Sequence, residues 1–154
     1  FPPGLHPEEI AVHIARNKAL TVQQRRNNDN IILAADTIVV LNEHIIGKPV
    51  HREEAITILM ALSGEKHQVI TGVVIRQGDK EISFADKTDV QFHDLTEKQI
   101  EFYVDKYNPY DKAGAYAIQE WIGVVGIQSI SGDFYNVMGL PVSRVVRELK
   151  KFNV

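Results

Sequence analysis

The sequence contains no cysteine, which excludes disulfides and thiolate-bound metal ions in its 154 residues. This absence fits a reducing compartment, and we expect the protein in the cytoplasm. No apolar run approaches the length of a membrane span. The formal net charge is −3, so the chain has no basic excess with which to bind DNA or RNA. We therefore expect neither a membrane nor a nucleic acid as a partner.

Three common catalytic signatures are also missing from the chain. No segment has the spacing of a Walker P-loop, and no serine stands in a Gly-x-Ser-x-Gly elbow. His51, His67 and His93 lack the i, i+4 spacing of a helical zinc pair, so we treat them as non-ligands. Any phosphate recognition must therefore depend on a few lysine or arginine side chains placed at one site.

The composition is ordinary for a globular protein, with 44% hydrophobic and 24% charged residues. The length suits one domain, or two small lobes that share a sheet. Four helices are predicted. Two cover residues 52–62 and 96–107, and the other two begin at residues 7 and 141. The predicted strands cover residues 31–41, 68–76, 81–92 and 123–130. This alternation predicts an α/β fold with a mixed sheet flanked by helices.

Two of the helices carry predictions about burial. In the first helix, which a loop at 25–30 follows, the buried face is marked only loosely by Ile10, Ile14 and Leu20. In the last helix we expect four apolar side chains to face the core: Val142, Val145, Val146 and Leu149.

Asp36 interrupts an otherwise apolar, β-branched strand. A run of this kind is typical of a strand covered on both faces. An ionised carboxylate there is costly unless it is paired, hydrogen-bonded or bound to a cation. Asp36 could be a structural carboxylate bonded to nearby backbone, or a ligand for Mg²⁺, which prefers one or two carboxylates plus phosphate oxygens. The same carboxylate could also orient or deprotonate an attacking water.

Two further segments carry side chains suited to a nucleotide. Lys48 stands in a Gly-Lys-Pro turn that can bring a positive charge near an anion, although a lysine in such a turn is more often simply solvated. Gln119 ends a glycine-containing loop over residues 110–119. Its amide carries a donor beside an acceptor, which matches the O4 and N3–H edge of uracil or thymine. A solvated glutamine after a turn is the alternative.

Taken in order along nearly the whole chain, these segments resemble the Maf family of nucleoside triphosphate pyrophosphatases, also called septum-formation inhibitor Maf. Each segment is weak alone, and their order makes the resemblance specific. The matching segments are Ala35-Asp36-Thr37, Gly47-Lys48-Pro49, Leu62-Ser63-Gly64 with His67, Thr71-Gly72, the 110–119 loop and the 136–141 loop.

The resemblance implies hydrolysis of the α–β phosphoanhydride of a nucleoside triphosphate to a monophosphate and pyrophosphate. It also implies a divalent cation, Mg²⁺ or Mn²⁺. The family fold is an elongated α/β structure with two lobes and a central cleft, similar to inosine triphosphate pyrophosphatases. Family members often pair as dimers, which leaves a homodimer open for this chain.

The resemblance also implies roles for individual residues. Asp36 matches the proton acceptor beside the metal, and Lys18 and Lys48 match lysines that line the phosphate cleft. Thr37 and Gln119 stand at positions associated with base selection. Their combination is similar to the branch that acts on dTTP and UTP.

Two alternatives to this function remain open. The family's name suggests a nucleotide-binding regulator of cell division that lacks turnover. An enzyme that acts on purine or modified nucleotides is the second alternative.

One part of the family pattern has no counterpart in the sequence. The family's opening strand and its Ser-Pro-Arg-Arg phosphate loop are not found, and the sequence starts at Phe1. We therefore expect a single Maf-like domain over residues 1–154 from which this N-terminal segment has been truncated.

Overall fold

The computed structural model describes residues 3–26 and 29–153, so the predicted loop at 25–30 is described only in part. At its centre lies a long hairpin of β3 (Lys66–Gln77) and β4 (Lys80–Phe92). The sheet adds β1 (Ile32–Leu41), β2 (His44–Ile46) and β5 (Ile127–Ser131) in the order β2-β1-β3-β4-β5. The predicted α/β class, with a sheet flanked by helices, is confirmed.

Every strand pairing in the described sheet is antiparallel, where the sequence predicted a mixed sheet. The reason lies in the connections. A tight turn at Asn42 and Glu43, both with positive φ, reverses the chain after β1. The helix α2 (Arg52–Leu62) then returns the chain to the same end of β1, so β3 starts beside the end of β1 and runs the opposite way.

The helix α1 (Pro7–Arg26) packs across one face of β1 and β3. Its contact stripe consists of Ala11, Ala15 and Ala19, all fully buried, whereas Ile14 and Leu20 are only half-buried. Because alanine side chains are short, the helix backbone approaches the sheet closely. A Cβ added to Gly72 on β3 would lie 2.3 Å from the backbone of Ala11. The glycine is therefore required for this approach.

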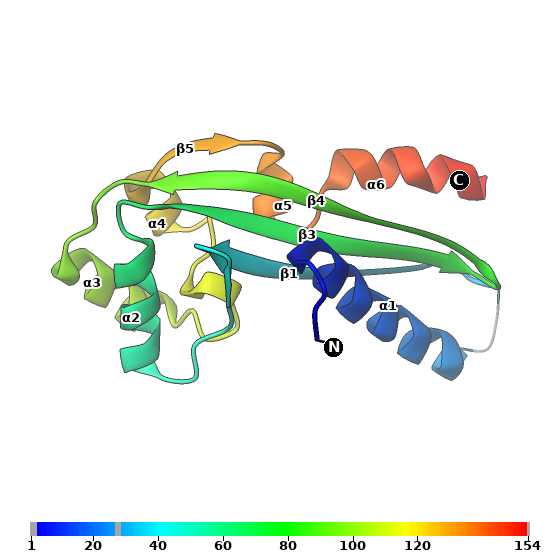
Figure 1. The fold of residues 1–154 in the computed structure, drawn as a ribbon, viewed down its shortest axis with the longest axis horizontal. Helices are drawn as coiled ribbons and strands as arrows, with labels where there is room; N and C mark the ends of the chain where they lie inside the picture. Colours follow the sequence, from blue (N-terminus) through cyan, green and yellow to red (C-terminus); the bar gives the residue numbers. More distant parts are fainter. Residues whose placement is uncertain (1–2, 27–28, 154) are drawn as a thin grey trace.

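The molecule is elongated, and α2, α3 (Glu97–Tyr107) and α4 (Trp121–Gly126) gather at one end of the sheet (Figure 1). They enclose the largest hydrophobic cluster, which includes Phe92, Tyr103 and Tyr116. The predicted capping box at the start of α3 is present, with Thr96 accepting from the backbone of Gln99 and Gln99 accepting in return. This end forms the helical lobe.

The sequence was wrong about residues 123–126, which it predicted as strand. They belong to α4, and β5 begins only at Ile127. A Cβ at Gly123 would lie 1.7 Å from the carbonyl oxygen of Ile118, so the chain turns tightly here. Ile122 is buried in the main core. This tertiary packing overrides the strand preference of an apolar, β-branched run.

The helix α6 (Val142–Leu149) covers the sheet face opposite α1, and the 3-10 turn η2 (Lys150–Phe152) follows it (Figure 1). Val145 is buried and Leu149 packs against the same cluster, as predicted. Val142 and Val146 were predicted to face inward but are 43% and 50% exposed. The contact stripe of this short helix is therefore narrow, and only two of the four apolar residues reach the sheet.

None of the helices in the described ranges combines the length and the apolar character that crossing a membrane requires.

Candidate active site

A cleft of about 290 Å³ opens where β1, the turn at 47–49, the 111–119 loop and the segment after β5 meet. Its lining includes all five residues singled out from the sequence: Lys18, Asp36, Thr37, Lys48 and Gln119. These residues are spread from position 18 to position 119, and apart from Asp36 and Thr37, which share β1, they come from separate segments. The fold thus brings together every candidate site residue.

The cleft lies along an edge of β1. The strand β2 pairs only with Val39–Leu41, so among the described residues Asp36 and Thr37 have a strand neighbour on one side alone. The prediction that this strand is covered on both faces is wrong for residues 33–37, which are half-buried or exposed. Ile32 at the start of the strand and residues 38–41 at its end are buried. Side chains from both faces can thus reach the cleft around this edge.

Asp36 projects toward α1 and forms an ion pair with Lys18. The Lys18 ammonium donates to Asp36 Oδ1 at 2.8 Å and to the carbonyl oxygen of Ala35 at 3.3 Å. The Asp36 side chain is 19% exposed and that of Lys18 is 54% exposed. The cross-strand neighbour of Asp36 is Gly72, the residue against which Ala11 packs. Lys18 lies seven residues, about two helical turns, after Ala11, so this close packing brings its amine to Asp36.

Thr37 projects to the opposite face and joins a hydrogen-bond network. Its hydroxyl shares a 2.9 Å hydrogen bond with the hydroxyl of Thr71 and donates to the carbonyl oxygen of Gly139 at 3.4 Å. Thr71 also donates to the carbonyl oxygen of Asn136 in α5 (Phe134–Met138) at 3.3 Å. The network ties the segment after β5 to the sheet beside the cleft.

Asn136 anchors this segment from within. It is fully buried, and its amide nitrogen donates to the carbonyl oxygens of Val69 and Asp86 and to the hydroxyl of Thr88. We assigned no role to Asn136 from the sequence. Its place in a loop ahead of a helix was visible, but its partners lie on β3 and β4, far away in the chain.

The turn that carries Lys48 is held against the 111–119 loop. The backbone nitrogen of Gly114 donates to the carbonyl oxygen of Gly47 at 3.3 Å. Gly114 has φ +72, and a Cβ there would lie 2.9 Å from the Val39 side chain. Lys48 forms no ion pair with any residue in the described ranges, and Gln119 is exposed at the other end of the same loop. Lys48 is therefore a cation without a counter-ion in the described part of the chain.

Two charged residues of the cleft were missed in the sequence analysis. Asp111 and Lys112 both line it, and their side chains form an ion pair at 3.3 Å. They belong to the loop that we had noted, but no spacing rule distinguishes a lysine in a turn from a solvated one. With them, three lysines and two aspartates line the cleft.

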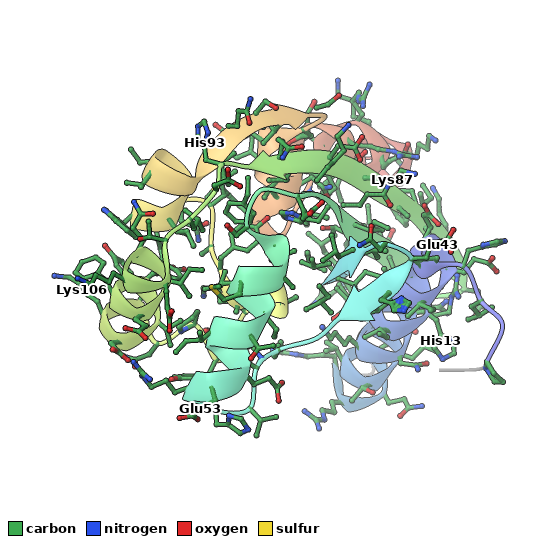
Figure 2. The ribbon with its side chains drawn as sticks, turned by 60° about the vertical axis from the view of Figure 1, so that its left-hand side comes forward. His13, Glu43, Glu53, Lys87, His93 and Lys106 are labelled. Atoms are coloured by element: carbon green, nitrogen blue, oxygen red, sulfur yellow. The ribbon has the colours of Figure 1, made fainter. Side chains whose placement is uncertain are left out.

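His67 lies behind the cleft wall. Its Nε2 and the hydroxyl of Tyr116, a lining residue, share a hydrogen bond of 2.6 Å, and its ring stacks on Phe92. Burial lowers the pKa of His67 from 6.5 to about 4. Its Nδ1 has no hydrogen-bond partner in the described residues. The histidine is therefore neutral and belongs to the core, whereas His13 and His93 lie far apart on the surface (Figure 2).

Asp36 offers one carboxylate to a divalent cation that arrives with phosphate groups. Within the described ranges, no group of three or more His, Cys, Asp or Glu side chains is placed to hold a metal ion. Asp36 reaches the cleft, and its ion pair with Lys18 uses Oδ1. A Mg²⁺ site of one or two carboxylates completed by phosphate oxygens matches this donor set.

Comparison with known proteins gives consistent matches over this chain. The family model described as "Maf-like protein" matches residues 2–152. A protein of Parabacteroides distasonis named dTTP/UTP pyrophosphatase is 48% identical over 152 residues, which cover 99% of this chain and 79% of that protein. A protein of Cytophaga hutchinsonii with the same name is 50% identical over 151 residues, covering 98% of this chain and 69% of that protein. Both the family match and the degree of identity show that the chain belongs to the Maf family.

Proposed function

We propose that this chain hydrolyses the α–β phosphoanhydride of dTTP and UTP, releasing the nucleoside monophosphate and pyrophosphate. Two observations support the proposal. Relatives that are 48% and 50% identical are named dTTP/UTP pyrophosphatase. Residues chosen from the sequence for this chemistry line a single cleft together. The second observation carries the proposal, because a metal, a triphosphate and a base need charged and amide groups within one cleft.

In the proposed mechanism, Asp36 orients an attacking water and accepts its proton. The water attacks the α-phosphorus in line with the bridging oxygen, the phosphorus–oxygen bond breaks, and pyrophosphate leaves. A divalent cation, Mg²⁺ or Mn²⁺, held by Asp36 and phosphate oxygens, would neutralise phosphate charge when bound. Lys18 and Lys48 stabilise the negative charge that develops on the bridging and leaving oxygens.

The ion pair between Lys18 and Asp36 is the arrangement of these two side chains before the substrate binds. The ammonium at 2.8 Å keeps a positive charge beside the carboxylate before the substrate enters. Because Lys18 is half-exposed on a flexible stem, it can turn toward a phosphate oxygen and release Asp36 for the water. Lys48 needs no such exchange, since no described residue pairs with it.

Base selection is proposed for Thr37 and Gln119. Gln119 is exposed at the end of the lining, and its amide can donate to O4 and accept from N3–H of uracil or thymine. The hydroxyl of Thr37 is held by Thr71, so its position is fixed before a nucleotide binds. The cytoplasmic location and the homodimer stay predictions.

A nucleotide panel tests this function. The protein is incubated with Mg²⁺ and UTP, dTTP, ATP, GTP or 7-methyl-GTP, and pyrophosphate release is measured. We expect the highest kcat/KM for UTP and dTTP. A higher kcat/KM for a purine nucleotide would contradict UTP and dTTP as the substrates. Binding of UTP without any pyrophosphate release would favour a nucleotide-binding regulator that lacks turnover.

A further inference from the structure

Lys112 lies in the wall of the cleft on the loop between α3 and α4. Its side chain is 32% exposed and lines the same cleft as Lys18 and Lys48. Its only ion-pair partner in the described residues is the neighbouring Asp111, whose side chain is 76% exposed. The lysine is thus more enclosed than its counter-ion.

The backbone around Lys112 is held in place on both sides. Its own nitrogen donates to the carbonyl oxygen of Pro109 at 3.3 Å, and its carbonyl oxygen accepts from Ala115 at 3.1 Å. Two residues later, Gly114 donates to Gly47, the residue before Lys48. The two lysine-bearing segments are therefore tied together, and both contribute side chains to the cleft.

The three lysines of the cleft differ in what neutralises them. Lys18 has Asp36 at 2.8 Å, and Lys48 has no ion-pair partner in the described residues. Lys112 has Asp111 at the longer distance of 3.3 Å. An exposed ion pair between sequence neighbours is weak, because water screens both charges. A phosphate group, with three oxygens, is a stronger partner for an ammonium in a half-enclosed cleft.

We infer that Lys112 is a third substrate-binding cation: its ammonium breaks the ion pair with Asp111 and binds the triphosphate chain. The Asp111 carboxylate therefore competes with the substrate for Lys112. This inference rests on the proposed function and deepens it. Lys112 acts on binding, since the described contacts place it beside no group that reacts. The proposed roles of Lys18 and Asp36 are unaffected.

The inference predicts effects of opposite sign for two neighbouring residues. Lys112→Met keeps the aliphatic stem and removes the charge, so the KM for UTP should rise about tenfold with kcat changed less than twofold. Asp111→Asn removes the competing carboxylate while keeping the size of the side chain. It should lower the KM for UTP about threefold, because Lys112 is then free to bind phosphate. A purely structural ion pair would not produce opposite signs.

The experiment compares wild type, Lys112→Met, Asp111→Asn and the control Lys106→Met. Lys106 extends from α3 at the outer edge of the helical lobe, outside the cleft lining (Figure 2). Pyrophosphate release is measured against UTP concentration, and thermal melting checks the folding of each variant. A raised KM for Lys112→Met with a lowered KM for Asp111→Asn supports the inference. Unchanged KM values, or shifts in the same direction, overturn it.

A second measurement separates this inference from the proposed function. Inorganic tripolyphosphate is titrated into the same four proteins in a calorimeter. If wild type releases no pyrophosphate from any nucleotide, the proposed function fails. Weaker tripolyphosphate binding by Lys112→Met alone would still support Lys112 as a phosphate-binding cation, and equal binding by all four proteins would overturn it.

Discussion

The two faces of β1 position their cleft residues by different means. On the α1 face, a stripe of alanines packs against Gly72, and this close approach brings Lys18 to Asp36. On the other face, hydrogen bonds from Thr71 and Asn136 hold the segment beside Thr37. The first face therefore places a charge by packing of small residues, and the second places a neutral group by a polar network. Changes on the two faces should have distinguishable consequences.

Gly72→Ala should disrupt the packing of α1 against β3 and have the largest effect on stability. The new Cβ would lie 2.3 Å from the backbone of Ala11, so α1 must shift away from the sheet. We expect a loss of about 3 kcal/mol in the free energy of unfolding. We also expect lower turnover of UTP, because the shift separates Lys18 from Asp36. Urea denaturation and pyrophosphate release measure the two effects.

Gly47→Ala is the matched control for stability. No atom lies within 4 Å of a Cβ placed there, and its φ is not positive. A Gly72→Ala protein as stable as Gly47→Ala would contradict the packing argument.

Asn136→Ala should disrupt the hydrogen-bond network on the other face of β1, with a somewhat smaller effect on stability. Two carbonyl oxygens and the Thr88 hydroxyl would lose their donor inside the protein. We expect a loss of about 2 to 3 kcal/mol in the free energy of unfolding. Because Thr37 loses its support, the preference for UTP over ATP should also shrink. Asn17→Ala, at an exposed position on α1, serves as the control and should change neither quantity.

The buried His67 should make stability depend on pH. Its pKa is about 4 in the folded protein and about 6.5 when unfolded, so the unfolded chain binds the proton more tightly. Stability is therefore full above pH 6.5 and falls as the pH decreases from 6.5 toward 4. Between pH 7 and pH 5 we expect a loss of about 2 kcal/mol in the free energy of unfolding.

His67→Gln removes the titrating group and can keep a hydrogen bond to Tyr116. Its free energy of unfolding should change less over the same pH range, because carboxylates contribute equally to both proteins. The same pH dependence in both proteins would show that His67 does not cause it.

The sequence predicted the candidate site better than the packing around it. The strand through Asp36 and the capping box at Thr96 follow from local patterns, and both are present in the structure, although the burial expected for residues 33–37 of the strand is not. The stripe of alanines on α1 was missed, because alanine carries little hydrophobic signal and its meaning depends on Gly72, a residue on another element.

Errors in the prediction have similar causes. Val146 fits the apolar period of α6, yet it is exposed because the contact stripe of the helix is narrow. Residues 123–126 look like a strand, but they belong to α4, which buries Ile122 in the main core. The role proposed for Lys112 could not be derived from a turn sequence. It needs the tie between Gly114 and Gly47 and the shared cleft, which only the fold creates.

Pyrophosphate release from UTP by Asp36→Asn tests the central claim most directly. Asparagine keeps the size of the side chain but removes the charge that would hold a cation and accept a proton. The control is Asp105→Asn, which breaks an ion pair of similar length, 2.7 Å to Arg52, outside the cleft. Asp36→Asn should remain folded and lose about a thousandfold in kcat, whereas Asp105→Asn should keep wild-type turnover. Full activity of a folded Asp36→Asn protein would contradict the account.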